Sequence, residues 1–146
     1  AVTMDPEQLE WLTEQTGRIL TAAVDRDARA ASDAIAETAD RYGHSGVYSL
    51  CCALAETVRV LVFPTVQGDG TLTGEILAMV KLPGATADRP TEWAGRFITT
   101  HVNGDGATNA TLFFHNLHDA GNVVVKGVAA LILIVGDVAR QAERAR

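Results

Sequence analysis

The sequence predicts an all-α protein, a single-domain bundle of five or six helices, on three observations. Apolar residues recur at steps of three and four over several segments, which is the spacing of one helix face. Alanine, the strongest helix former, is abundant. Gly, Pro and Asp residues separate the periodic segments. A length of 146 residues suits one domain, and we expect residues 1–4 and 144–146 to be frayed.

The longest periodic segment, from Asp5 to about Tyr42, predicts a long amphipathic N-terminal helix. Asp5 is a suitable N-cap and Pro6 suits the first helical position. Gly43 is a natural stop. A break near Asp25–Arg29 is the alternative to one continuous helix. The stripe of this helix comprises Leu9, Leu12, Thr16, Leu20, Val24, Ala28, Ala31, Ile35, Ala39 and Tyr42.

Five further helices are expected after Gly43, each bounded by turn or capping residues such as Asp105, which can cap the fourth of them. The last helix is apolar almost all round through Val135, which predicts a buried, strongly apolar C-terminal helix at the centre of the bundle. The expected ranges are Val47–Phe63, Thr71–Leu82, Glu92–Val102, Ala107–Ala120 and Val123–Glu143.

Charge, cysteine content and hydropathy exclude several classes of protein. The net charge is −6 and the pI about 5.1, whereas proteins that bind nucleic acid usually present a basic surface. The adjacent Cys51 and Cys52 are too few for a disulfide framework, which favours a reducing compartment. The longest uncharged apolar run, Gly127–Gly136, is about half the length that a bilayer needs. The first residues lack the features of a signal peptide. We therefore expect a cytoplasmic protein without nucleic-acid or membrane partners.

Three residues near the end of the fifth predicted helix form a candidate metal site. His115 and His118 are three residues apart, and His115 and Asp119 are four apart. Such spacings place side chains on one helix surface, where they could form one edge of a metal site completed by another helix. The alternative is that His115 and His118 are ordinary histidines, either on the protein surface or where the surface meets the core. No phosphate-binding or nucleophile motif is present, and we expect no cofactor.

Two pairs of acidic residues form a second candidate metal site. Glu7-x-x-Glu10 and Glu37-x-x-Asp40 resemble the magnesium-binding signature of the all-α nucleotide pyrophosphohydrolases. The resemblance covers these four residues and implies a hydrolase in which carboxylates from two facing helices hold Mg²⁺ against a nucleotide triphosphate. A continuous helix over residues 5–42 would keep the two pairs from facing each other.

The excess of apolar residues points to protein contacts. The helices over Val47–Phe63 and Val123–Val135 lack a wide polar face. Either one of them packs inside a layer formed by the others, or it forms a subunit interface. The candidate interface residues are Leu131 and Ile132 in the last helix and Trp11 at the edge of the first stripe.

The sequence contains no complete catalytic constellation. The leading hypothesis is therefore a non-catalytic helical protein that acts through protein–protein contacts as a homodimer. The alternatives are the magnesium-dependent nucleotide hydrolase and a small-ligand binder. A ligand pocket would lie between helices near Phe113, Phe114 and His118.

Overall fold

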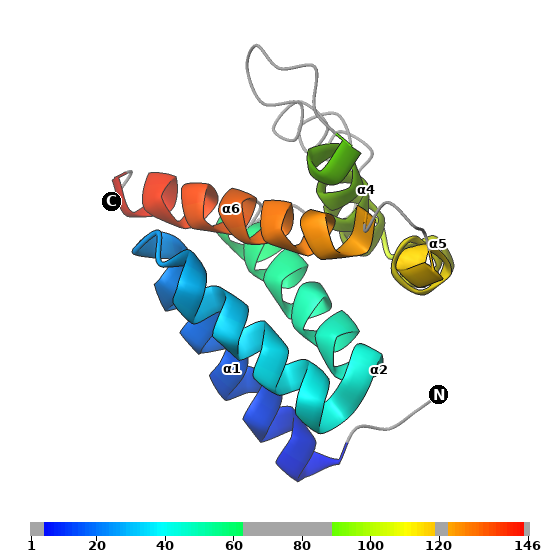
Figure 1. The fold of residues 1–146 in the computed structure, drawn as a ribbon. Helices are drawn as coiled ribbons and strands as arrows, with labels where there is room; N and C mark the ends of the chain where they lie inside the picture. Colours follow the sequence, from blue (N-terminus) through cyan, green and yellow to red (C-terminus); the bar gives the residue numbers. More distant parts are fainter. Residues whose placement is uncertain (1–4, 63–88, 119–122, 145–146) are drawn as a thin grey trace.

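Five α-helices and one short 3₁₀ helix make up the part of the chain that the computed structural model describes, which is residues 5–62, 89–118 and 123–144 (Figure 1). No strand occurs in these residues, so the predicted all-α class is confirmed. The helix expected over Thr71–Leu82 lies outside the described residues. The helices are α1 (Pro6–Val24), α2 (Ala28–Val62), α4 (Arg89–Val102), α5 (Gly106–Phe114), η1 (His115–His118) and α6 (Val123–Arg144).

Two of the predicted helix starts are confirmed by their caps. The Asp5 carboxylate accepts a hydrogen bond from the Glu7 amide at 3.0 Å and begins α1. The Asp105 carboxylate accepts from the Thr108 amide at 3.2 Å and begins α5. Each cap satisfies an amide that has no partner within its own helix. Short-range sequence signals therefore locate these two starts.

The continuous helix predicted over residues 5–42 is wrong, and the chain breaks inside the alternative segment Asp25–Arg29. Arg26 has a φ of 57°, in the left-handed region. The Arg26 amide donates to the Ala23 carbonyl and the Asp27 amide to the Ala22 carbonyl, a pairing that closes a helix C-terminus. The first part of α2 then folds back along α1, with which it is in extensive contact (Figure 1).

Arg26 occupies a backbone position that usually holds glycine. We expect Arg26→Gly to raise the free energy of unfolding by about 1 kcal/mol, because glycine adopts a positive φ without a clash at Cβ. Arg26→Ala keeps the positive φ and is the matched control, which should show no such gain. Equilibrium denaturation in urea measures both variants. If Arg26→Gly and Arg26→Ala had the same free energy of unfolding, the positive φ at residue 26 would not be strained.

The second bend falls at Gly43, where the sequence predicts a helix stop. Gly43 has φ 69° and ψ −158°, and it interrupts the helical backbone inside α2. The residues after Gly43 run back toward α6 (Figure 1). A Cβ placed on Gly46 would lie 3.2 Å from the Thr38 side chain, eight residues earlier, which shows how sharp the bend is. Helical segments thus lie on both sides of Gly43, as expected, although the one before it begins at Ala28.

The core lies where α6 crosses the other long helices. Helix α6 contacts α1, α2 and α4, and its Leu131 and Val135 are fully buried. They pack with Leu50 and Leu54 of α2 and with Phe97 of α4, which are fully buried as well. The central position expected for the last helix is therefore confirmed, although one face of α6 remains uncovered.

Helix α2 passes a composition test for membrane-spanning helices among the described residues. Its most apolar 18-residue stretch has a mean hydropathy of 1.4. The core helix of a soluble protein passes the same test. In the bundle Leu50, Cys51 and Leu54 of this stretch are fully buried, and 39% of the stretch as a whole is buried.

Candidate functional site

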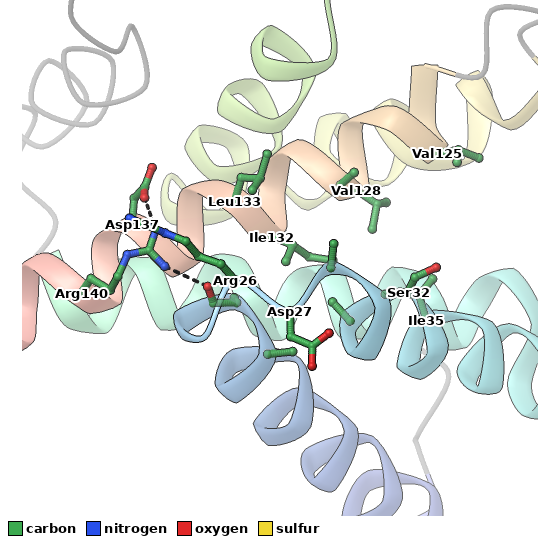
Figure 2. Close-up of a pocket in the computed structure, with 15 residues that line it drawn as sticks. Arg26, Asp27, Ser32, Ile35, Val125, Val128, Ile132, Leu133, Asp137 and Arg140 are labelled. Atoms are coloured by element: carbon green, nitrogen blue, oxygen red, sulfur yellow. Dashed lines mark hydrogen bonds and ion pairs between the residues drawn. The ribbon is translucent and has the colours of Figure 1, made fainter.

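A groove lies between α6 and the corner that joins α1 to α2 (Figure 2). Its volume is about 490 Å³. The corner is built from alanines, whose side chains end at Cβ and leave the facing side of α6 uncovered. The residues that line the groove include Val125, Val128, Ala129, Ile132 and Leu133 of α6, Ala22 and Ala23 of α1, and Ala28, Ala31, Ser32 and Ile35 of α2.

The α6 side of this groove carries a stripe of exposed apolar residues, Val125, Ala129 and Leu133. They are spaced by four and so lie on one face of the helix. Val125 is 70% exposed and Leu133 is 68% exposed. The prediction of a buried C-terminal helix is thus correct for one side of α6 only. An apolar stripe left open next to a groove is typical of a binding surface.

Arg140 and Asp137 form the polar end of the groove. The Arg140 guanidinium donates to the Ala23 carbonyl at 2.9 Å and to the Val24 carbonyl at 3.1 Å. It also forms an ion pair with Asp137 (Figure 2). Arg140 therefore donates to the last carbonyls of α1, and that of Ala23 also accepts from the Arg26 amide. The backbones of α1 and α6 approach each other closely here. A Cβ added to Gly136 would lie 2.7 Å from the Ala23 carbonyl oxygen.

The three predicted interface residues have different environments. Leu131 is fully buried in the core of its own chain, which agrees with the alternative that the last helix packs inside a layer formed by the others. Ile132, the next residue, lines the groove. Trp11 packs edge-on against Tyr42, with ring centroids 5.3 Å apart, and the Arg41 guanidinium lies 5.0 Å from its ring centroid. Trp11 is thus part of the α1–α2 contact and does not line the groove.

The predicted ligand pocket near Phe113, Phe114 and His118 is a region of packed rings. Phe113 is buried, and Tyr48 of α2 packs against Phe113 and Phe114 with centroid distances of 5.4 and 5.0 Å. The Tyr48 hydroxyl donates to the Asn109 side chain at 2.6 Å, and burial raises the pKa of this hydroxyl. The side chain of His118 lies outside the described residues. The groove beside α6 is a separate feature that sequence reasoning missed.

The four acidic residues of the second candidate site lie on two neighbouring helices. The break after α1 puts Glu7 and Glu10 on α1 and Glu37 and Asp40 on α2, contrary to the continuous-helix prediction. Glu7, however, lies 3.7 Å from Arg41, and Glu37 accepts a hydrogen bond from Arg18. The hydrogen bond from Arg18 is the main cause that lowers the pKa of Glu37. Two of the four carboxylates, those of Glu7 and Glu37, are thus paired with arginines.

The histidine candidate site is only partly inside the described region. Helix α5 ends at Phe114, well before the predicted end at Ala120, and η1 follows it. The Leu112 carbonyl accepts hydrogen bonds from the side chains of Trp93 and Asn116 at the point where the α-helix ends. Asp119 and the His118 side chain are outside the described residues. Within the residues described, no three His, Cys, Asp or Glu side chains are grouped so that they could hold a metal ion.

The two cysteines lie inside the bundle on α2. Cys51 is fully buried and Cys52 is half-buried. Burial raises the pKa of both thiols, so they remain protonated at neutral pH. This environment is that of small core side chains.

A charged cluster links α2 to α4. The Glu56 carboxylate accepts hydrogen bonds from Arg59 at 2.6 and 2.7 Å, and the His101 ring nitrogen Nε2 lies 3.1 Å from it. The bonds from Arg59 are the main cause that lowers the pKa of Glu56 to about 2. The sequence analysis did not select this cluster, because the contact between Glu56 and His101 joins residues 45 positions apart.

This cluster predicts an acid-sensitive contribution to stability. Glu56 has a lowered pKa in the folded chain, so its contribution is present above the ordinary value of 4.5 and is lost as the pH falls toward about 2. Glu56→Gln removes this titration. The free energy of unfolding of the variant should therefore fall less between pH 4.5 and pH 2 than that of the wild type. Urea denaturation at several pH values measures the slope, and identical slopes would contradict the assignment.

Comparison with known proteins finds no match for this chain among family models, curated proteins or solved structures. The class of the protein therefore follows from its fold and its groove. It is an all-α helical bundle whose central helix α6 leaves one apolar face uncovered beside a groove.

Proposed function

We propose that this protein is a non-catalytic helical protein that acts through protein–protein contacts and forms a homodimer through the groove beside α6. The exposure of Val125 and Leu133 is the observation that carries the proposal. Large apolar side chains next to a groove are stabilised when a second surface excludes water from them. The neighbouring Ile132 extends the same surface into the groove.

The charges around the groove support a second copy of the chain as the partner. Arg26 and Asp27 of the α1–α2 corner and Asp137 of α6 line the groove, and Lys126 is exposed next to Val125. Both signs are thus present around the groove, which suits an isologous interface because the same patch must complement itself. The chain as a whole has a net charge of −6. If the interface were uniformly acidic, its like charges would repel one another and oppose association.

The molar mass in solution tests this proposal. Light scattering over a hundredfold dilution should give about 31 kDa, twice the 15.5 kDa of the chain. A mass of 15.5 kDa over the whole range would contradict the homodimer.

The groove volume favours one second candidate function, the binding of a small apolar ligand. A volume of about 490 Å³ falls within the range of ligand pockets. Arg26 lines the groove, and within the described part of the chain its guanidinium has no ion pair. A ligand with an apolar chain and a carboxylate would match both features. Calorimetric titration of the monomeric chain with dodecanoate tests this function, and the absence of saturable heat would exclude it for this ligand class.

A further inference from the structure

We infer that the two copies pair through antiparallel α6 helices, with Leu133 of each copy packed over the partner's Ala129. This inference rests on the proposed homodimer and specifies its geometry. Three independent features of α6 carry it, namely the sizes of the exposed residues, the positions of two exposed charges and the small side chains beside the stripe.

The sizes of the stripe residues favour the antiparallel arrangement. Along α6 the stripe has a large residue, a small one and a large one: Val125, Ala129 and Leu133. In an antiparallel pair related by a two-fold axis, placing Leu133 over the partner's Ala129 also places the partner's Leu133 over Ala129. Both large side chains then fill the positions left by small ones, as ridges fill grooves in packed helices. A parallel pair would set Leu133 against its own copy and leave a gap at Ala129.

The exposed charges on α6 favour the same arrangement. Lys126 and Asp137 are both exposed and lie near opposite ends of the stripe. Antiparallel pairing brings Lys126 next to the partner's Asp137, whereas parallel pairing would set each charge beside its own copy. Lys126 has no ion pair among the described residues. Asp137 uses one oxygen, Oδ1, for Arg140 and keeps Oδ2 for a partner.

Small side chains beside the stripe allow a second helix to approach α6 closely. Packed helices have axes about 8–10 Å apart, which requires small side chains at the point of closest approach. Ala129 occupies that point on α6, and Ala28 and Ser32 line the facing wall on α2. Ile132 and Ile35 then provide apolar contacts on the two walls for the side chains of the incoming helix (Figure 2).

Cysteine cross-linking of the full chain tests the register directly. An equimolar mixture of Ala129→Cys and Leu133→Cys chains should form a disulfide-linked heterodimer under mild oxidation. Val125→Cys alone should not cross-link, because two copies of residue 125 would be about 18 Å apart along the antiparallel helices. The wild-type chain, with Cys51 buried and Cys52 half-buried, sets the background.

Charge reversal provides a second measurement that does not depend on oxidation. Lys126→Glu and Asp137→Lys should each weaken the homodimer about tenfold, because each creates two like-charge contacts. Mixing the two variants should restore wild-type affinity, since both contacts in the mixed dimer then join opposite charges. Circular dichroism of each variant alone verifies that the fold is intact. This control matters most for Asp137→Lys, which also removes the ion pair with Arg140.

The outcomes separate the register from the homodimer itself. Cross-linking of the mixed pair together with restored affinity supports the antiparallel register. A dimer of the wild type in which Val125→Cys cross-links, or in which no position does, overturns the register and leaves the homodimer standing. A wild-type chain that is monomeric at every concentration overturns both.

Discussion

Leu133→Asp is expected to convert the homodimer into a folded monomer. In the single chain Leu133 is 68% exposed, so an aspartate there costs the bundle little. In the dimer the same carboxylate would be packed against the partner's Ala129 and shielded from water, and there are two such sites. Burying an unpaired charge at an interface costs several kcal/mol, so we expect the dissociation constant to rise by roughly 1,000-fold or more.

Sedimentation or light scattering measures the loss of the dimer, and circular dichroism verifies that helix content is unchanged. Leu9→Asp is the matched control, because Leu9 is a leucine that is 56% exposed on α1 and does not line the groove. Leu9→Asp should leave the dimer intact, and so should the volume-conserving Leu133→Met. A Leu133→Asp chain that remains dimeric would place the interface elsewhere on the molecule.

Gly127→Ala is expected to lower the free energy of unfolding by about 2 kcal/mol, although alanine is the better helix former. A Cβ at residue 127 would lie 2.3 Å from the Cε3 atom of Trp93. Trp93 cannot move away easily, since its indole N–H donates to the Leu112 carbonyl at 2.8 Å and its ring stacks on Phe97 with centroids 5.2 Å apart. The added methyl group must therefore displace α6 from α4.

Thermal and urea denaturation measure this effect against a second glycine. Gly17 lies in the middle of α1 with nothing within 4 Å of an added Cβ. Gly17→Ala should therefore stabilise the chain by about 0.5–1 kcal/mol. Trp93→Phe in the Gly127→Ala background should recover part of the loss, because it removes Cε3 and Cζ3, two of the three ring atoms that the added Cβ would meet. Equal effects of the two glycine substitutions would show that α6 and α4 are not in close contact at this point.

The local features of this fold could be predicted because each depends on residues only a few positions apart. Asp5 and Asp105 cap the helices that they precede, and the chain bends at Gly43. A cap is formed by a side chain and an amide two or three residues later, so the sequence contains both partners. The positive φ at Gly43 likewise depends on the missing Cβ of that residue.

The break after α1 could be offered only as an alternative, because the apolar stripe continues through residues 25–29. Arg26 adopts a positive φ there at an energetic cost to its own backbone. What offsets this cost is the return of α2 along α1, which lets Ile19 and Ala34 become fully buried. The same break places the carboxylate pairs on neighbouring helices, where Arg18 and Arg41 reach them.

The sequence by itself determined the all-α class, the caps and the apolar character of the last helix. Only the tertiary structure decided which side of α6 is covered. The exposed Val125 and Leu133 are of the same apolar type as the covered residues of α6, and the neighbours that cover the helix come from distant parts of the chain. Here α1, α2 and α4 cover Leu131 and Val135, while the alanines of the α1–α2 corner are too small to reach Val125 and Leu133.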